Sequence, residues 1–272
     1  MSPSKKSPWH STLELYRKLG IRYVSMERTA SIQADPVIKE VVAETAPDEP
    51  VREVSAAPVS TVEMAPPPAS VKTKWLTAQA DTIEAMELTA FDQDICGCQK
   101  CPLGATRKNF VFGSGNPQAK IMFIGEAPGA DEDEQGLPFV GRAGQLLTKI
   151  IESTQIWKRP DVFICNVLKC RPPGNRTPQP EEVEQCRPYL EEQIQIIKPK
   201  LIIALGASAA QAVLKTTESV GKLRNQWHDY NGIPLRVTYH PAALLRFEGY
   251  KKDVWQDMKE ATAKFKELEG LT

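Results

Sequence analysis

From residue 121 onward, short apolar runs alternate with amphipathic segments. Glycine, proline or polar residues bound each run, a pattern typical of buried strands. The runs lie at residues 121–124, 161–168, 201–205 and 233–239. Segments with helical spacing lie at 141–154 and 181–198, in the Ala-rich stretch after Gly206, and at 250–268. Strands that alternate with helices predict a three-layer α/β/α domain with a central four-stranded parallel sheet.

The N-terminal part of the chain has a different pattern. Residues 12–24 resemble a short amphipathic helix that ends at Gly20, either a semi-ordered appendage or a segment that docks on a protein partner or on the chain itself. Residues 35–74 contain seven prolines and many small or acidic residues, which is typical of a disordered linker. We therefore divide the chain into a helical segment at 1–34, a linker at 35–74 and a folded domain at 75–272.

Composition and charge narrow the class of protein. The formal net charge is zero, so a nucleic-acid partner would have to bind a local basic patch. No run is long enough to span a membrane, and the Lys-containing N-terminus lacks an apolar signal core. We expect a cytoplasmic, reducing location, where cysteines serve as ligands or nucleophiles more often than as disulfides.

Six cysteines provide candidate metal ligands. Cys165 lies inside a predicted strand and is expected to be core filler. Cys98 and Cys101 form a closely spaced pair, while Cys170 and Cys186 flank a proline-rich loop and the next helix. Four thiolates could hold a structural zinc or an iron–sulfur cluster, and the spacing does not choose between them. Cys96 could replace Cys98 as a ligand or be a bystander.

Three polar side chains follow the predicted strands. Glu126 comes after the run at 121–124, Asn166 near the end of the run at 161–168, and His240 after the run at 233–239. Ligands of open α/β sheets bind beyond the carboxyl ends of the strands, so we expect these side chains to share a site. Gly125 and Gly129 would let a ligand approach the backbone closely.

Taken together, the motifs resemble the family 4 uracil-DNA glycosylases, the iron–sulfur branch of that superfamily. The resemblance covers about residues 90–265. Its motifs are Gly-Glu-Ala-Pro-Gly at 125–129, Leu-Pro-Phe-Val-Gly at 137–141, Asn-Val-Leu-Lys-Cys-Arg-Pro-Pro-Gly-Asn-Arg at 166–176 and His-Pro-Ala at 240–242. The family's cysteine pattern is matched by Cys98-x2-Cys101-x68-Cys170-x15-Cys186.

The resemblance implies excision of uracil from DNA and a [4Fe–4S] cluster on Cys98, Cys101, Cys170 and Cys186. A base inside a duplex must be flipped into a pocket and read on its Watson–Crick edge. The carboxamide of Asn166 can match uracil O4 and N3–H. His240 can donate to O2 as the anionic base leaves, and Glu126 can position water and stabilise the sugar cation.

Other residues have two possible roles. Phe139 either stacks on the flipped base or packs in the core, and Gly125 and Ala127 are expected to line the base pocket. The resemblance gives Glu132 the task of blocking the methyl group of thymine, with Asp131, Asp133 and Glu134 as surface charges.

Local basic groups in the proline loop and after His-Pro-Ala are the expected DNA contacts. They are Lys169, Arg171, Arg176 and Arg246. Leu244 is expected either to wedge into the gap left by the base or to begin a helix. Between Asn166 and Cys186 there is no inserted Arg/His-rich loop of the kind found in covalently trapping relatives, so no covalent product is expected.

Two other classes of protein share some of these features. A non-catalytic iron–sulfur or zinc module that binds nucleic acid, tethered to replication or repair machinery, would keep the cysteines but would not need Glu126, Asn166 and His240 together. A redox protein is disfavoured because the sequence has no dinucleotide fingerprint. The favoured hypothesis is a monomeric, nucleoid-associated enzyme that starts base excision repair.

Overall fold

The structure is a computed structural model that describes residues 82–271. The helix and linker predicted at 1–34 and 35–74 lie outside these residues. The first described helix is α2 (Ile83–Ile95), near the start of the folded domain predicted at 75–272. It begins at Thr82, whose hydroxyl accepts the amide of Ala85 at 3.2 Å and so caps the first turn.

The central sheet has six strands in the order β1-β3-β2-β4-β6-β5. Its four inner strands are parallel and correspond to the four apolar runs, which confirms that part of the prediction. They are β2 (Ile121–Gly125), β3 (Phe163–Asn166), β4 (Leu201–Leu205) and β6 (Ile233–Thr238).

The predicted strand count was too low because two antiparallel edge strands were missed. β1 (Ser114–Gly115) has only two residues and pairs with β3. β5 (Trp227–Tyr230) pairs with β6, and its residues alternate between exposed and half-buried. Neither strand is buried on both faces, so neither produces the continuous apolar run that marks an inner strand.

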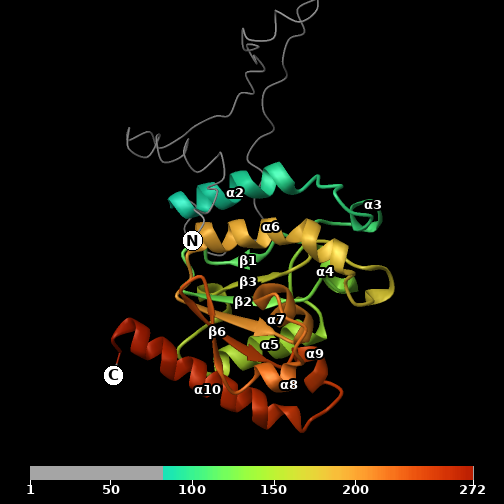
Figure 1. Ribbon diagram of the computed structural model, residues 1–272. Coiled ribbons are helices and arrows are strands. Elements are labelled where there is room, and N and C mark those ends of the chain that lie inside the picture. The colour runs from blue at the N-terminus through green and yellow to red at the C-terminus, as the bar shows by residue number, and fades with distance from the viewer. Residues whose placement is uncertain (1–81, 272) are drawn as a thin grey trace, which may run out of the picture. The chain divides into compact units, whose positions relative to one another are not determined.

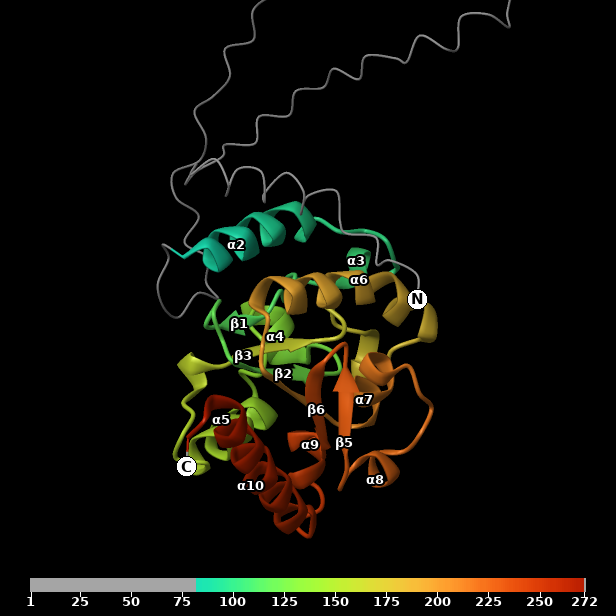
Figure 2. The ribbon, with the colours of Figure 1, turned by 60° about the vertical axis from the view of Figure 1, so that its left-hand side comes forward.

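Successive residues of the inner strands enter two separate cores. On β2, Met122 and Ile124 belong to one core, and Ile121 and Phe123 belong to the other. The first core also includes residues of α2, α6 (Pro180–Ile197) and α7 (Ala207–Leu214). The second includes residues of α5 (Arg142–Ser153), α9 (Pro241–Leu244) and α10 (Tyr250–Glu269). Figures 1 and 2 show α2 and α6 on one side of the sheet and α5 and α10 on the other, which confirms the three layers.

Short helical turns connect these elements and were not predicted as helices. They are α3 (Leu103–Thr106), α4 (Ala130–Gln135), α8 (Val220–Leu223) and the 3₁₀ turns η2 (Arg159–Asp161) and η3 (Pro173–Asn175). α4 contains the acidic cluster that follows β2. This helix is too short to show an apolar face in the sequence. It ends at Gly136, which has a left-handed backbone.

A buried charge network fixes α10 beneath the end of β6. Asp257 accepts hydrogen bonds from Arg224 at 2.9 Å, Arg236 at 3.1 Å and Thr238 at 2.7 Å. Thr238 is the last residue of β6, two positions before His240. The network therefore holds the strand end that presents His240. None of the helices among residues 82–271 is long and apolar enough to cross a membrane.

Candidate active site

The carboxyl ends of β2 and β3 meet at one edge of the sheet. Gly125 and Asn166, the last residues of these strands, are partners in the parallel register. A Cβ atom added to Gly125 would lie 2.4 Å from Asn166 Oδ1 and 2.5 Å from Phe139 Cζ. Only glycine fits this position, because the carboxamide and the aromatic ring approach the backbone from the side a Cβ would take.

Asn166 presents an unsatisfied polar atom at this edge. The residue is 2% exposed, and its Oδ1 accepts no hydrogen bond from the described residues. Buried polar atoms are normally paired, so an orphan acceptor next to an aromatic ring is a candidate ligand contact. Its backbone is fixed, because the carbonyl of Asn166 accepts a hydrogen bond from the Lys169 ammonium at 2.8 Å.

Phe139 completes one wall of the site and has a left-handed backbone with φ 53°. That conformation is unusual for an aromatic residue and needs support from its surroundings. Arg159 donates to the carbonyl of Pro138 at 2.8 Å. On α5, Gly144 lies against Phe139 so closely that a Cβ there would be 1.9 Å from the Phe139 carbonyl oxygen.

Glu132 supports the same loop from α4. One carboxylate oxygen accepts the amides of Val140 and Gly141, both at 2.9 Å, and the other accepts the amide of Gly129 at 3.1 Å. The structure thus gives Glu132 a positioning contact with the loop that carries Phe139. The methyl-blocking role expected for it stays a prediction.

The other acidic residues of α4 have different surroundings. Asp133, expected at the surface, is instead buried and accepts the amide of Lys108 at 2.9 Å. Asp131 and Glu134 are exposed, as expected.

His240 approaches from β6 and caps α9. Its Nδ1 accepts the amide of Ala242 at 3.1 Å, so the neutral ring carries its proton on Nε2. Burial lowers the pKa of His240 to about 4, and the positive charge of Arg246 adds to the effect. The imidazole is therefore neutral near pH 7 and offers an N–H donor. Its ring centroid lies 5.5 Å from that of Phe139.

Glu126 and Ala127 extend the site beyond β2. Both are half-buried, and the carbonyl of Glu126 accepts the amide of Leu168 at 3.0 Å. Its carboxylate has no hydrogen bond or ion pair with the described part of the chain. A carboxylate without a partner at a strand end is available to a ligand or to water.

The expected DNA contacts are only partly at the surface. Arg171, half-buried, donates to Asn175 Oδ1 at 2.7 Å, whereas Arg176 is exposed and pairs with Glu182 at 2.6 Å. Arg246 is exposed beside His240. The prediction for Lys169 was wrong, because its side chain is fully buried, with 0% exposure.

The wedge assignment of Leu244 was also wrong for this structure. Leu244 is 3% exposed and belongs to the core that includes α5 and α10, so the helix alternative applies. The next apolar side chains, Leu245 and Phe247, are 45% and 59% exposed. The sequence Leu-Leu-Arg-Phe does not show which leucine faces inward. In the structure the last residue of α9, Leu244, faces inward and Leu245 faces outward.

Four cysteines belong to or pack against the core that includes α6. Burial raises the pKa of Cys186 to about 12, and the nearby thiols of Cys170 and Cys101 add to the rise. Burial also raises the pKa of Cys170, where Cys101 and Cys98 contribute. Cys170 and Cys186 belong to one core, and Cys98 and Cys101 pack against it.

Polar side chains contact two of these sulfurs. The Tyr189 hydroxyl donates to Cys98 Sγ at 3.2 Å, and Arg107 donates to Cys170 Sγ at 3.3 Å. Cys96 is exposed and its thiol turns back to the carbonyl of Gln93, which favours the bystander alternative. Cys165 is buried in the core, as expected.

Among residues 82–271, no three His, Cys, Asp or Glu side chains are grouped tightly enough to hold a single metal ion. The sulfurs around one zinc ion crowd within bonding distance of a common centre. The ligands of a multi-iron cluster are spread around a larger body.

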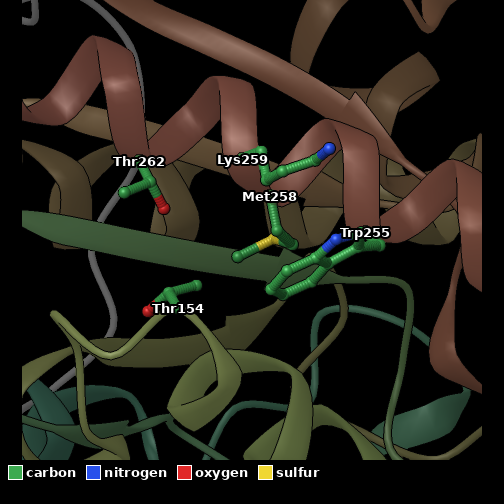
Figure 3. A pocket seen from close by; sticks show the side chains of 5 residues that line it. All are labelled: Thr154, Trp255, Met258, Lys259 and Thr262. Atoms are coloured by element: carbon green, nitrogen blue, oxygen red, sulfur yellow. The ribbon is translucent and has the colours of Figure 1, made fainter.

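A small surface pocket lies elsewhere, between the end of α5 and α10 (Figure 3). In this view Met258 and Trp255 of α10 face Thr154 across the gap. It measures about 110 Å³ and is lined by none of the residues described above.

Comparison with known proteins identifies the family. Residues 112–259 match the family model described as the uracil DNA glycosylase superfamily. A type-4 uracil-DNA glycosylase of Pyrobaculum aerophilum is 46% identical over 183 residues, which cover 64% of this chain and 92% of that protein. One from Saccharolobus solfataricus is 47% identical over 171 residues, covering 60% and 79%.

A type-5 enzyme of Pyrobaculum aerophilum is less similar, with 32% identity over 146 residues that cover 48% of this chain and 64% of that protein. The chain is thus more similar to these two type-4 proteins than to this type-5 enzyme. The chain belongs to the uracil-DNA glycosylase superfamily and, within it, to the type-4 uracil-DNA glycosylases.

Proposed function

We propose that this protein removes uracil from DNA by hydrolysing the bond between uracil N1 and deoxyribose C1′. Water adds to C1′, the base leaves as an N1 anion that then takes a proton, and an abasic site remains. The observation that carries the proposal is the orphan Oδ1 of Asn166, buried between Gly125 and Phe139. A flipped uracil would supply the missing donor through N3–H.

Recognition of the base rests on Asn166 and Phe139. Oδ1 of Asn166 accepts from uracil N3–H while its amide group donates to O4. Cytosine has an amino group where uracil has O4 and lacks the N3 proton, so both contacts would be lost. Phe139 stacks on the ring, and Gly125 and Ala127 leave room for the base beside the backbone.

Departure of the base depends on His240 and Glu126. As the glycosidic bond breaks, negative charge grows on the uracil ring and positive charge on the sugar. The neutral His240 donates its Nε2–H to uracil O2, where the negative charge develops. The carboxylate of Glu126 stabilises the oxocarbenium-like sugar and orients the attacking water.

Contact with the DNA backbone comes from Arg171, Arg176 and Arg246. Since Leu244 is in the core, we assign the wedge to the exposed Leu245 and Phe247, which follow it. Apolar wedges fill the gap that a flipped base leaves and reduce the cost of unstacking. Arg246 lies between the two apolar side chains in sequence, where it can meet a phosphate near the flipped nucleotide.

Cys98, Cys101, Cys170 and Cys186 are proposed to hold a [4Fe–4S] cluster. The packing of all four residues in or against one core and the similarity to type-4 uracil-DNA glycosylases support it. When bound, the cluster supplies a cross-link between the segment at 98–101, the proline loop and α6. The chain's own part is to fix the loop that follows Asn166, because Cys170 lies four residues after the base reader.

The direct test is incubation of purified protein with end-labelled oligonucleotides that contain one uracil, single-stranded and paired, followed by alkali. Matched strands with thymine or cytosine at the same position serve as controls. We expect breaks at uracil alone. An absence of breaks in protein that contains its iron and sulfide would overturn the glycosylase function. Purified protein that contains iron without acid-labile sulfide, or zinc alone, would contradict the proposal of a [4Fe–4S] cluster.

A further inference from the structure

Three aromatic rings form a contiguous group that begins next to His240 and that the proposed mechanism does not use. Tyr239, the residue before His240, stacks on Tyr250 at the start of α10, with ring centroids 4.0 Å apart and 14° between the planes. Phe247 packs against Tyr250 at 5.7 Å, with 56° between the planes. This aromatic stack of Tyr239, Tyr250 and Phe247 leads from the end of β6 to the surface, where Phe247 is 59% exposed.

The end of the stack beside His240 is anchored to α10. The guanidinium carbon of Arg224 lies 4.5 Å from the ring centroid of Tyr239, a cation–π contact. Arg224 is buried and pairs with Asp257 at 2.9 Å and Asp253 at 3.3 Å, both on α10. Tyr239 therefore has two connections to this helix, one through the ring of Tyr250 and one through Arg224.

The backbone makes a parallel connection between His240 and the exposed ring. The carbonyl of His240 accepts the amide of Ala243 at 2.8 Å, and the carbonyl of Ala243 accepts the amide of Phe247 at 2.8 Å. The carbonyl of Phe247 then accepts the amide of Tyr250 at 3.3 Å. Closely packed groups transmit displacements, so a contact that fixes Phe247 also restrains the turn that carries His240.

The exposed end of the stack has the chemistry of a single-strand DNA contact. Every base has a π face that can stack on an aromatic ring such as Phe247, and cations beside the ring can meet phosphates. Arg246 and Lys252 are exposed, and neither takes part in an ion pair among residues 82–271. A base next to the flipped uridine is therefore the occupant that this surface fits.

We propose that Tyr250 and Tyr239 are positioning residues that couple the stacking of a DNA base on Phe247 to the orientation of His240. The proposal rests on uracil excision as the function. A base held on Phe247 restrains the aromatic stack, and the stack restrains the strand end from which His240 donates to uracil. A stack with a merely structural role would stabilise α10, but contact at Phe247 would not affect the chemical step.

The test is a double-mutant cycle on the full chain. Tyr250→Leu removes the central ring, Phe247→Ala removes the exposed ring, and the double variant removes both. Tyr250→Phe keeps the ring, and Trp255→Leu removes another aromatic side chain of α10, one that lines the pocket of Figure 3. Two quantities are measured. One is the single-turnover excision rate at saturating protein, and the other is the affinity for the same strand with an uncleavable abasic analogue in place of the uridine.

For Tyr250→Leu we expect an excision rate about 2–30-fold below wild type, the range for residues that connect two sites. Its affinity for the abasic strand should stay within about twofold of wild type, since the DNA-facing ring remains. Phe247→Ala should weaken that affinity about 5–150-fold, as for loss of one stacked base, and should also lower the saturated rate. The double variant should be no slower than Tyr250→Leu, because coupled residues are not additive. Tyr250→Phe and Trp255→Leu should excise uracil at the wild-type rate.

Rate losses that add in the double variant would overturn the proposal, because the two rings would then act independently. An equal loss in Trp255→Leu would overturn it as well, since any aromatic residue of α10 would then suffice. If Tyr250→Leu does not accumulate, Phe247→Ala decides alone, and a wild-type rate at saturating protein would overturn the coupling. Wild-type protein that binds the abasic strand but leaves uracil in place would instead overturn the proposed function, and this inference with it.

Discussion

The ring of Phe139 lies 5.5 Å from the imidazole of His240, with 34° between the two planes. Phe139 follows α4 and His240 follows β6, so the contact joins segments that are far apart in the sequence. Phe139 keeps a left-handed backbone to reach this position, at a cost of about 1–3 kcal/mol. Arg159, Glu132 and Gly144 hold it there. The strained backbone of Phe139 therefore lies beside the proposed base pocket. We infer that it holds the ring in the position needed to stack on a flipped base.

Gly125→Ala is expected to disrupt the base pocket. The new Cβ would lie 2.4 Å from Asn166 Oδ1 and 2.5 Å from Phe139 Cζ, so one of these side chains must move. We expect a loss of about 1–3 kcal/mol in unfolding free energy, typical of overpacking, together with a large loss of kcat/KM on uracil-containing DNA. The control is Gly221→Ala, where nothing lies within 4 Å of the new Cβ. Similar kinetics in the two variants would contradict the packing argument.

Asn166→Asp is expected to weaken uracil recognition. The carboxylate accepts from N3–H but cannot donate to O4, which it repels. Loss of one buried hydrogen bond costs about 1–3 kcal/mol, so kcat/KM should fall by about 10–100-fold. Single-turnover excision with increasing protein concentration measures the effect. Asn231→Asp, at an exposed turn between β5 and β6, is the matched control. Wild-type kcat/KM in Asn166→Asp would remove Asn166 from the site.

That Asn166 and His240 lie at the same edge of the sheet could be predicted from the sequence, whereas their roles stay predictions. Asn166 and His240 were placed because they end apolar runs, and strand ends of a parallel sheet converge by topology. The surface position expected for Lys169 and the wedge alternative for Leu244 were wrong for a different reason. Both lie in short loops or turns where no periodicity tells inside from outside, and a basic or apolar residue was assumed to face DNA. The edge strand β5 was missed because its exposed residues follow no apolar pattern.

His240→Asn is expected to slow the chemical step more than it weakens DNA binding. Asparagine retains an acceptor for the amide of Ala242 and is a favourable helix cap, so α9 should persist. It cannot place a donor where Nε2–H lies. Loss of one oxyanion donor costs about 10²–10³ in rate. Single-turnover rates and DNA-binding titrations separate the effects, and equal losses in both would favour a structural role.

The stability of the protein should depend on His240 between pH 4 and 6.5. The pKa of this imidazole falls from 6.5 to about 4 on folding, chiefly because of burial. In this window the unfolded chain binds a proton that the folded chain does not, so stability falls as pH falls. Denaturant unfolding of wild type and His240→Asn at several pH values gives the difference. The wild type should lose more stability than the variant toward pH 4, and parallel profiles would contradict the shift.

Glu132→Gln separates a positioning role from exclusion of thymine. The amide can still accept from Val140 and Gly141 through its oxygen, but its nitrogen cannot accept from Gly129. A positioning role predicts a loss of about 1 kcal/mol in stability and slower uracil excision with thymine still rejected. Glu134→Gln, in an exposed ion pair with Lys108, should be near neutral. Excision of thymine by Glu132→Gln would instead support the methyl-blocking role.

Leu244→Ala and Leu245→Ala should have opposite consequences, although the residues are adjacent. Leu244 is in the core, so its truncation leaves a cavity and should cost about 2–5 kcal/mol of stability. Leu245 is exposed, and its truncation should leave stability within about 0.5 kcal/mol. If Leu245 fills the gap in the duplex, Leu245→Ala should slow excision from paired uracil and spare single-stranded uracil, where no stack has to be replaced. Melting curves measure the stability of both variants, and excision rates on paired and single-stranded substrates measure the wedge. Equal slowing by Leu245→Ala on both substrates would contradict a wedge role for Leu245.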